Sequence, residues 1–74
     1  MKPTNKQPNP QYLIIATTTN CLVKDVPTTL EQTRSTVRWW LKQPQTRTIY
    51  VKVDSISYKY NAGDETHAAG WEIL

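Results

Sequence analysis

Few side chains in this sequence could bind a metal ion or take part in catalysis. Asp64, Glu65 and His67 lie together in the polar segment NAGDETHAAG, residues 61–70. A zinc site generally uses three or four ligands, several of them histidine or cysteine, and this chain has one histidine and one distant cysteine, Cys21. We therefore expect this segment to be a solvated loop that holds no metal ion, and we expect no cofactor.

A cysteine nucleophile is the other chemistry that the sequence could supply. Cys21, with His67 as its base, is the only conceivable pair. Cys21 lies in the segment CLVKDV, where a small buried core residue is the simpler interpretation. The sequence also has no evident pair of carboxylates flanking a cleft and no phosphate-loop lysine at the required spacing. We therefore predict that this protein is not an enzyme.

A basic ridge in the middle of the chain points to binding instead. Arg34, Arg38 and Lys42 recur at every fourth position, which places them along one side of a helix. Trp39 lies beside them in the sequence, and tryptophan is enriched at the energetic centres of interfaces. We expect these four residues to dock onto a protein or nucleoprotein partner. In the other interpretation the basic residues are solvated and Trp39 lies under the N-terminal tail or a loop.

Aromatic and basic residues on a predicted sheet give an alternative function. Tyr50 and Lys52 share one face of the segment TRTIYVKV, and a hairpin would place Lys59 opposite Tyr50. Such residues on an open sheet can stack nucleic-acid bases and bind phosphates, although tyrosine and lysine are also ordinary strand residues. Nucleic-acid binding through Tyr50, Lys52 and Lys59 is therefore the second hypothesis.

The basic ridge requires a helix, and residues 28–43 carry the signals of one. Thr28 and Glu31 fit a capping box, in which each side chain satisfies a free backbone N–H group. No helix-breaking residue follows until Pro44, which cannot continue a helix. We predict a helix between these two points.

The apolar stripe of this helix decides which tryptophan belongs to the core. Leu30, Val37 and Leu41 fall within about 40° of one another at about 100° per residue. They predict the side of the helix that packs on the core. Trp40 flanks this stripe and can turn inward, whereas Trp39 points away from it.

Apolar and β-branched residues predict short strands on both sides of the helix. The predicted strands are residues 12–18, 21–26, 46–53, 56–60 and 71–74. The first two read as a hairpin, with a single strand that runs into a loop as the alternative.

The third and fourth strands show a change of phase in their apolar residues. A two-residue turn at Asp54-Ser55 explains it, and a bulge in one long strand is the alternative. The turn predicts three cross-strand pairs: Val53 with Ile56, Val51 with Tyr58 and Ile49 with Tyr60.

The order strand, strand, helix, strand, strand, strand with short links predicts an α+β fold. We expect a small two-layer sandwich, in which an antiparallel sheet of four to five strands has the helix packed on one face. Residues 1–10 contain three prolines and are predicted to be a flexible tail, and residues 11–74 a single domain. The second sheet face is expected to stay in water unless a partner covers it.

Composition limits the partners and the setting. Nine Lys and Arg residues against six Asp and Glu residues give a net charge of +3, which favours acidic partners. A single cysteine cannot form an internal disulfide, so we expect a cytoplasmic protein, and no apolar run is long enough to span a membrane. The uncovered sheet face and the edge strands CLVKDV or WEIL favour a homodimer.

The layout of residues 11–74, a helix on a short antiparallel sheet in a very small basic chain, resembles several phage-encoded inhibitors of bacterial defence systems, including anti-CRISPR proteins. The resemblance is one of layout and involves no sequence motif. It implies a small inhibitor that acts by covering the surface of another molecule.

Overall fold

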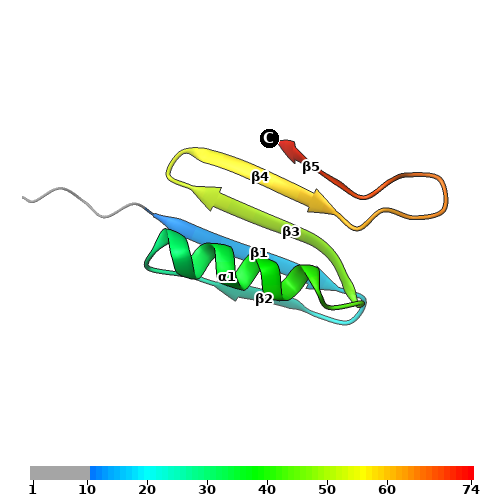
Figure 1. Cartoon of the computed structure of the whole chain (residues 1–74), viewed down its shortest axis with the longest axis horizontal. Coiled ribbons are helices and arrows are strands. Elements are labelled where there is room, and N and C mark those ends of the chain that lie inside the picture. Colours follow the sequence, from blue (N-terminus) through cyan, green and yellow to red (C-terminus); the bar gives the residue numbers. More distant parts are fainter. Residues whose placement is uncertain (1–10) are drawn as a thin grey trace, which may run out of the picture.

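The computed structural model describes residues 11–74, which form five strands and one helix (Figure 1). In chain order the elements are β1 (Tyr12–Thr18), β2 (Leu22–Asp25), α1 (Leu30–Leu41), β3 (Thr46–Val53), β4 (Ile56–Asn61) and β5 (Gly70–Ile73). All strand pairs are antiparallel, and the sheet order is β2-β1-β3-β4-β5. The predicted α+β fold with the helix on one sheet face is confirmed. The predicted tail, residues 1–10, lies outside the described residues.

The turn between β3 and β4 sets the register of the sheet centre, as predicted. Val53 pairs with Ile56, Val51 with Tyr58 and Ile49 with Tyr60. Asp54 has a positive φ of 55°, which a tight two-residue hairpin loop requires at one or both of its positions. Its backbone N–H donates to the Gln11 carbonyl at 2.9 Å, and its Oδ1 accepts from the Gln11 N–H at 3.2 Å. The start of β1 therefore helps to hold this turn.

The N-terminus of α1 begins one residue later than predicted. Thr29 is the N-cap, and its Oγ1 accepts from the Gln32 N–H at 3.0 Å. The Gln32 side-chain oxygen in turn accepts from the N–H and the hydroxyl of Thr28, both at 3.0 Å. The expected Thr28–Glu31 box is therefore wrong, because Thr29 and Gln32 satisfy the same spacing rule and their side chains are the ones used.

The helix packs on the sheet through a different stripe from the predicted one. Its buried residues are Thr33 and Trp40, and Val37 is half-buried, whereas Leu30 and Leu41 are largely exposed. The helix is thus rotated by about 60° from the expected orientation. The physical reason is the size of Trp40, which fills the space over the core strands. The prediction that Trp40 turns inward and Trp39 away is confirmed.

The core lies under the helix and is formed by five buried apolar residues: Ile14, Ala16, Trp40, Ile49 and Val51. A buried polar contact closes its end, because Thr46 Oγ1 donates to the Trp40 carbonyl at 2.8 Å. The same carbonyl also accepts from the Gln43 N–H at 3.1 Å. Together these donors replace the partner that a carbonyl at the helix C-terminus lacks within the helix.

The helix covers only part of its sheet face. Its backbone lies close to those of β1 and β3 and, within residues 11–74, not to those of β2, β4 or β5. Strands are about 4.8 Å apart and a helix is about 10 Å wide, so one helix covers about two strands. Figure 1 shows β4 and β5 extending beyond the helix. The part of this apolar face on β4 and β5 is therefore left open. Among the described residues, no helix is both long and apolar enough to cross a bilayer.

Candidate functional site

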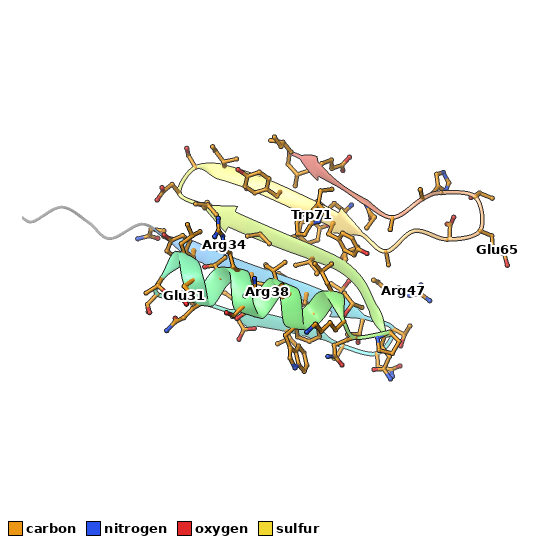
Figure 2. The ribbon with its side chains drawn as sticks, viewed as in Figure 1. Glu31, Arg34, Arg38, Arg47, Glu65 and Trp71 are labelled. Carbon is orange, nitrogen blue, oxygen red and sulfur yellow. The ribbon has the colours of Figure 1, made fainter. Side chains whose placement is uncertain are left out.

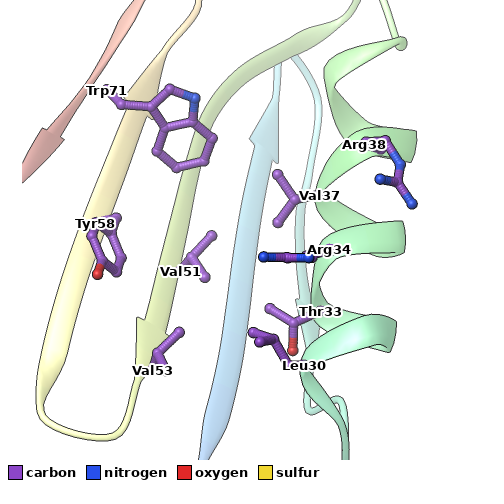
Figure 3. A pocket seen from close by; sticks show the side chains of 9 residues that line it. All are labelled: Leu30, Thr33, Arg34, Val37, Arg38, Val51, Val53, Tyr58 and Trp71. Carbon is purple, nitrogen blue, oxygen red and sulfur yellow. The ribbon is translucent and has the colours of Figure 1, made fainter.

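A groove of about 440 Å³ runs between α1 and the uncovered strands (Figure 3). Val51 and Val53 of β3 form its floor. Its two walls come from opposite sides of this floor and consist mainly of four side chains: Leu30 and Val37 from α1, and Tyr58 and Trp71 from β4 and β5. The groove is therefore an apolar channel bounded by a helix on one side and aromatic rings on the other.

The aromatic wall follows from the register of the last two strands. Trp71 pairs with Tyr60 across β4 and β5, so both rings project from the same face of the sheet. Their ring centroids are 5.3 Å apart, within the range of favourable aromatic contacts. Figure 3 shows the indole of Trp71 reaching from β5 towards β3. Although it is held by Tyr60, Trp71 is 46% exposed, because no helix lies above it.

Two arginines border the groove on the helix side. Arg34 extends from α1 towards the strands, while the guanidinium group of Arg38 lies over the helix itself (Figures 2 and 3). Within residues 11–74 neither guanidinium forms an ion pair; the close acidic–basic contact found there joins His67 to Asp64. The groove therefore combines an apolar interior with a positively charged rim.

The structure brings together only part of the predicted partner surface. Arg34 and Arg38 lie at the groove, whereas Trp39 lies about 140° around the helix from Arg34 and is not part of the groove. Trp39 is 54% exposed and packs edge-on against Trp40, with ring centroids 4.8 Å apart. Lys42 is the exposed C-cap residue. The predicted ridge therefore divides into a groove-side pair and a separate tryptophan.

The groove residues of the sheet were not among the predicted site residues. Alternation along the strands predicted core positions for Val51, Val53 and Tyr58, and Trp71 was predicted to belong to the last strand. The available signal was that one short helix cannot cover a sheet of five strands. That signal indicates an exposed apolar region without giving its position.

The three residues of the second hypothesis lie together on the opposite sheet face. Tyr50 and Lys59 are cross-strand partners, and Lys52 lies on the same face of β3. Lys59 Nζ is 5.4 Å from the centroid of the Tyr50 ring, a cation–π contact. Because the ammonium group occupies one side of the ring, a base could stack on that side only if Lys59 moved.

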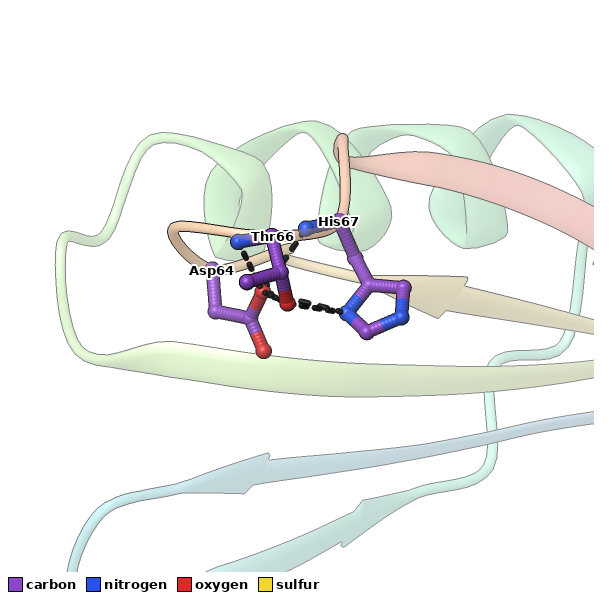
Figure 4. A network of polar contacts seen from close by, with 3 residues as sticks. All are labelled: Asp64, Thr66 and His67. Atoms are coloured by element: carbon purple, nitrogen blue, oxygen red, sulfur yellow. Dashed lines mark hydrogen bonds and ion pairs between the residues drawn. The ribbon is translucent and has the colours of Figure 1, made fainter.

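The polar loop between β4 and β5 forms a closed network of its own (Figure 4). Asp64 Oδ1 accepts from the backbone N–H groups of Thr66 and His67, both at 2.8 Å, and from the Thr66 hydroxyl at 3.0 Å. These hydrogen bonds, led by that from the Thr66 N–H, lower the pKa of Asp64 below its ordinary value. Nδ1 of His67 lies 3.2 Å from the same oxygen. The carboxylate thus serves as the hub of a turn.

Gly63 lies in the same loop at a position that excludes a side chain. Gly63 has φ +84°, and a Cβ there would lie 2.7 Å from the backbone N of Ala69, so only glycine fits this position.

The expectation that Cys21 is a core residue is wrong. Cys21 precedes β2 and is exposed, because the turn and not the strand includes it, and its Sγ lies 3.3 Å from the Thr18 hydroxyl. Among residues 11–74 no group of three or more His, Cys, Asp or Glu residues is placed to hold a metal ion.

Comparison with known protein families, with curated proteins and with solved structures gave no match for this chain.

Proposed function

We propose that this chain is a non-catalytic binding protein that docks onto a protein partner through the α1 side of the molecule. The observation that carries the proposal is the groove, an apolar channel with Arg34 and Arg38 on its rim that the fold itself leaves uncovered. Large exposed apolar patches on small proteins usually mark interaction sites. Here Trp71 and Ile73 add exposed apolar area next to the groove.

The remaining features of α1 extend the same surface. Trp39 and Lys42 are exposed on the helix beyond the groove, so a partner that wraps around α1 would contact all four basic and aromatic residues of the ridge. An inhibitor that blocks a surface of a protein or nucleoprotein is the role that the layout resemblance implies. We place this role in the cytoplasm, because an exposed free thiol such as Cys21 persists best in a reducing compartment.

Capture from the cells that make this protein tests the proposal. The bait is the full chain as wild type, as Trp39→Ala and as the double variant Arg34→Glu/Arg38→Glu. The matched control is Lys24→Glu/Arg47→Glu, which changes the net charge by the same amount at exposed positions away from α1. We expect a protein that wild type and control retain and that at least one α1 variant loses. Equal retention by all four baits would contradict the proposal.

Nucleic-acid binding through Tyr50, Lys52 and Lys59 is the second candidate. The observation in its favour is that the strand register gathers these three side chains on one face. Phosphate contacts make affinity fall steeply with salt, so a salt titration with single-stranded and duplex oligonucleotides tests it. Binding that weakens with salt and is lost in Lys52→Glu/Lys59→Glu supports it, and no binding at low salt removes it.

A further inference from the structure

We propose that the groove binds an amphipathic α-helix of the partner protein, and that this helix carries acidic residues one turn apart on the edge that faces α1. The inference rests on the proposed function, because it names the part of the partner that would dock. Three properties of the groove lead to it: the width of the uncovered sheet, the apolar lining and the uncompensated charge of the rim.

The width of the open region fits one helix. Two strands, β4 and β5, lie beyond the reach of α1, and two strands at about 4.8 Å spacing match the width of a helix of about 10 Å. An added helix would lie beside α1 on the same face and form a layer of two helices over β1, β3, β4 and β5. An added strand would instead pair at the edge of β5 and leave the groove open.

The lining of the groove fits the apolar stripe of such a helix. Val51 and Val53 at its floor and Leu30, Tyr58 and Trp71 on its walls come from three strands and α1. The helix-side wall extends from Leu30 to Arg38, which corresponds to about 12 Å of helix axis. A partner helix of two to three turns, with apolar residues at every third or fourth position, covers that length.

The rim selects the sign of charge on the partner. Arg34 and Arg38 are one turn apart, about 6 Å along the helix, and neither guanidinium has a carboxylate partner within residues 11–74. Two carboxylates at positions i and i+4 on the partner helix would match this spacing. Guanidinium groups pair with carboxylates in a two-pronged geometry, so acidic residues at the helix edge give both affinity and orientation.

The charges disfavour two other occupants. A second copy of this chain could offer its own α1, but that helix carries the same basic ridge and would place arginine against arginine. The segment 1–10 has two lysines, no acidic residue and Met1 as its only large apolar residue. Neither supplies an apolar stripe with an acidic edge.

A pair of synthetic helical peptides tests the inference on the full chain. Both peptides have about four turns and an identical Leu/Ile stripe; one carries Glu at two positions one turn apart beside the stripe, and the other carries Lys there. Binding is measured by NMR titration. We expect the Glu peptide to shift the signals of Val51, Val53 and Trp71 and to bind about tenfold more tightly than the Lys peptide. That ratio corresponds to about 1.4 kcal/mol shared by two exposed rim pairs.

Charge exchange provides the decisive control. In Arg34→Glu/Arg38→Glu the preference should invert in favour of the Lys peptide, whereas Lys24→Glu/Arg47→Glu should keep the wild-type order. No binding of either peptide, an unchanged order after charge reversal, or shifts confined to Tyr50 and Lys52 would overturn the inference. Concentration-dependent shifts of Val51 and Trp71 without peptide would overturn it in favour of a second copy.

The peptide and capture experiments separate this inference from the proposed function. Loss of the captured protein in Trp39→Ala but not in Arg34→Glu/Arg38→Glu would leave the proposed function intact and reject the groove as its site. Peptide binding with the predicted charge preference, together with equal retention by all baits in the capture experiment, would support the chemistry of the groove and reject the proposed function.

Discussion

The two halves of one sheet face differ in coverage far more than in composition. Under α1, Ile14 and Ile49 are fully buried, whereas on the uncovered half Ile73 is 72% exposed and Trp71 46% exposed. Both halves consist of apolar residues that alternate along their strands and pair across them. The difference arises because a single helix covers about two strands. Apolar residues on the first half therefore stabilise the fold, and those on the second half are available to a partner.

This contrast explains how a chain of 74 residues can hold a large apolar groove. Domains of this size bury a smaller fraction of their surface than larger domains do, about 60%, so the covered half must supply most of the stability. The helix is anchored there by Trp40, while its opposite flank and the far strands stay free. Three pairs of substitutions and one pH titration test this division.

The adjacent tryptophans should differ most. Trp40→Ala removes the largest core side chain and should lower the free energy of unfolding by about 3–5 kcal/mol. Trp39→Ala should lower it by about 1 kcal/mol, because only the edge-on contact with Trp40 is lost. Urea unfolding followed by circular dichroism measures both values. Equal losses would show that Trp39 belongs to the core and would remove it from the interaction surface.

The same substitution on the two halves gives the most direct comparison. Ile49→Ala creates a cavity under the helix and should cost about 2–5 kcal/mol. Ile73→Ala truncates an exposed side chain and should change stability by at most about 0.5 kcal/mol. The denaturant midpoints of the two variants measure these changes in stability. A substantial loss of stability in Ile73→Ala would mean that β5 is part of the stabilising core.

The polar contact at the end of the covered half should have a moderate effect. Thr46→Val keeps the shape of the side chain and removes one of two hydrogen bonds to the Trp40 carbonyl, which still accepts from the Gln43 N–H at 3.1 Å. Loss of one such hydrogen bond should cost about 0.5–1.5 kcal/mol. Thr48→Val, at a half-buried position of the same strand, removes a hydroxyl–hydroxyl contact with Thr17 and leaves the helix end untouched; it is the comparison. If thermal unfolding of Thr46→Val matches that of wild type, the helix end is held by other contacts.

The order of the loop between β4 and β5 should depend on pH, because its hydrogen-bond network requires the ionised carboxylate of Asp64. The folded-state pKa of Asp64 is lowered, so its contribution to loop order is complete above its ordinary pKa of 3.8 and is lost as the pH falls through the lower folded value. NMR signals of the Thr66 and His67 amides should titrate with a midpoint below 3.8. The transition should disappear in Asp64→Asn. A midpoint at or above the ordinary value would show that the network does not persist in solution.

Sequence patterns predicted the sheet better than the placement of the helix on it. The apolar pattern changes phase at Asp54 and Ser55, and a two-residue turn there keeps Val51 and Tyr58 on one face. The register of β3 and β4 could therefore be predicted from local sequence. The rotation of α1 could not, because it depends on how Trp40 fits over β1 and β3. The one-residue error at the N-cap has a local cause, since two adjacent threonines satisfy the same rule.

The groove, like the rotation of α1, could not be predicted from the sequence, because it depends on how separate elements pack. The spacing of Arg34 and Arg38 placed them on one side of a helix, but their neighbours across the groove come from β3, β4 and β5. A sequence shows that a strand has an apolar face without showing whether another element lies on it. The separation of Trp39 from Arg34 could have been predicted, because a rotation of about 100° per residue places them far apart around the helix.

Site-specific photocrosslinking in the cells that make this protein tests whether the uncovered half of the helix-side face is the partner surface. A photoreactive phenylalanine derivative replaces Trp71 in one variant and Tyr50 in another; these two positions lie on opposite faces of the sheet, and both are aromatic and partly exposed. We expect an adduct with another protein from position 71 and none from position 50. An adduct from position 50 alone would contradict this expectation.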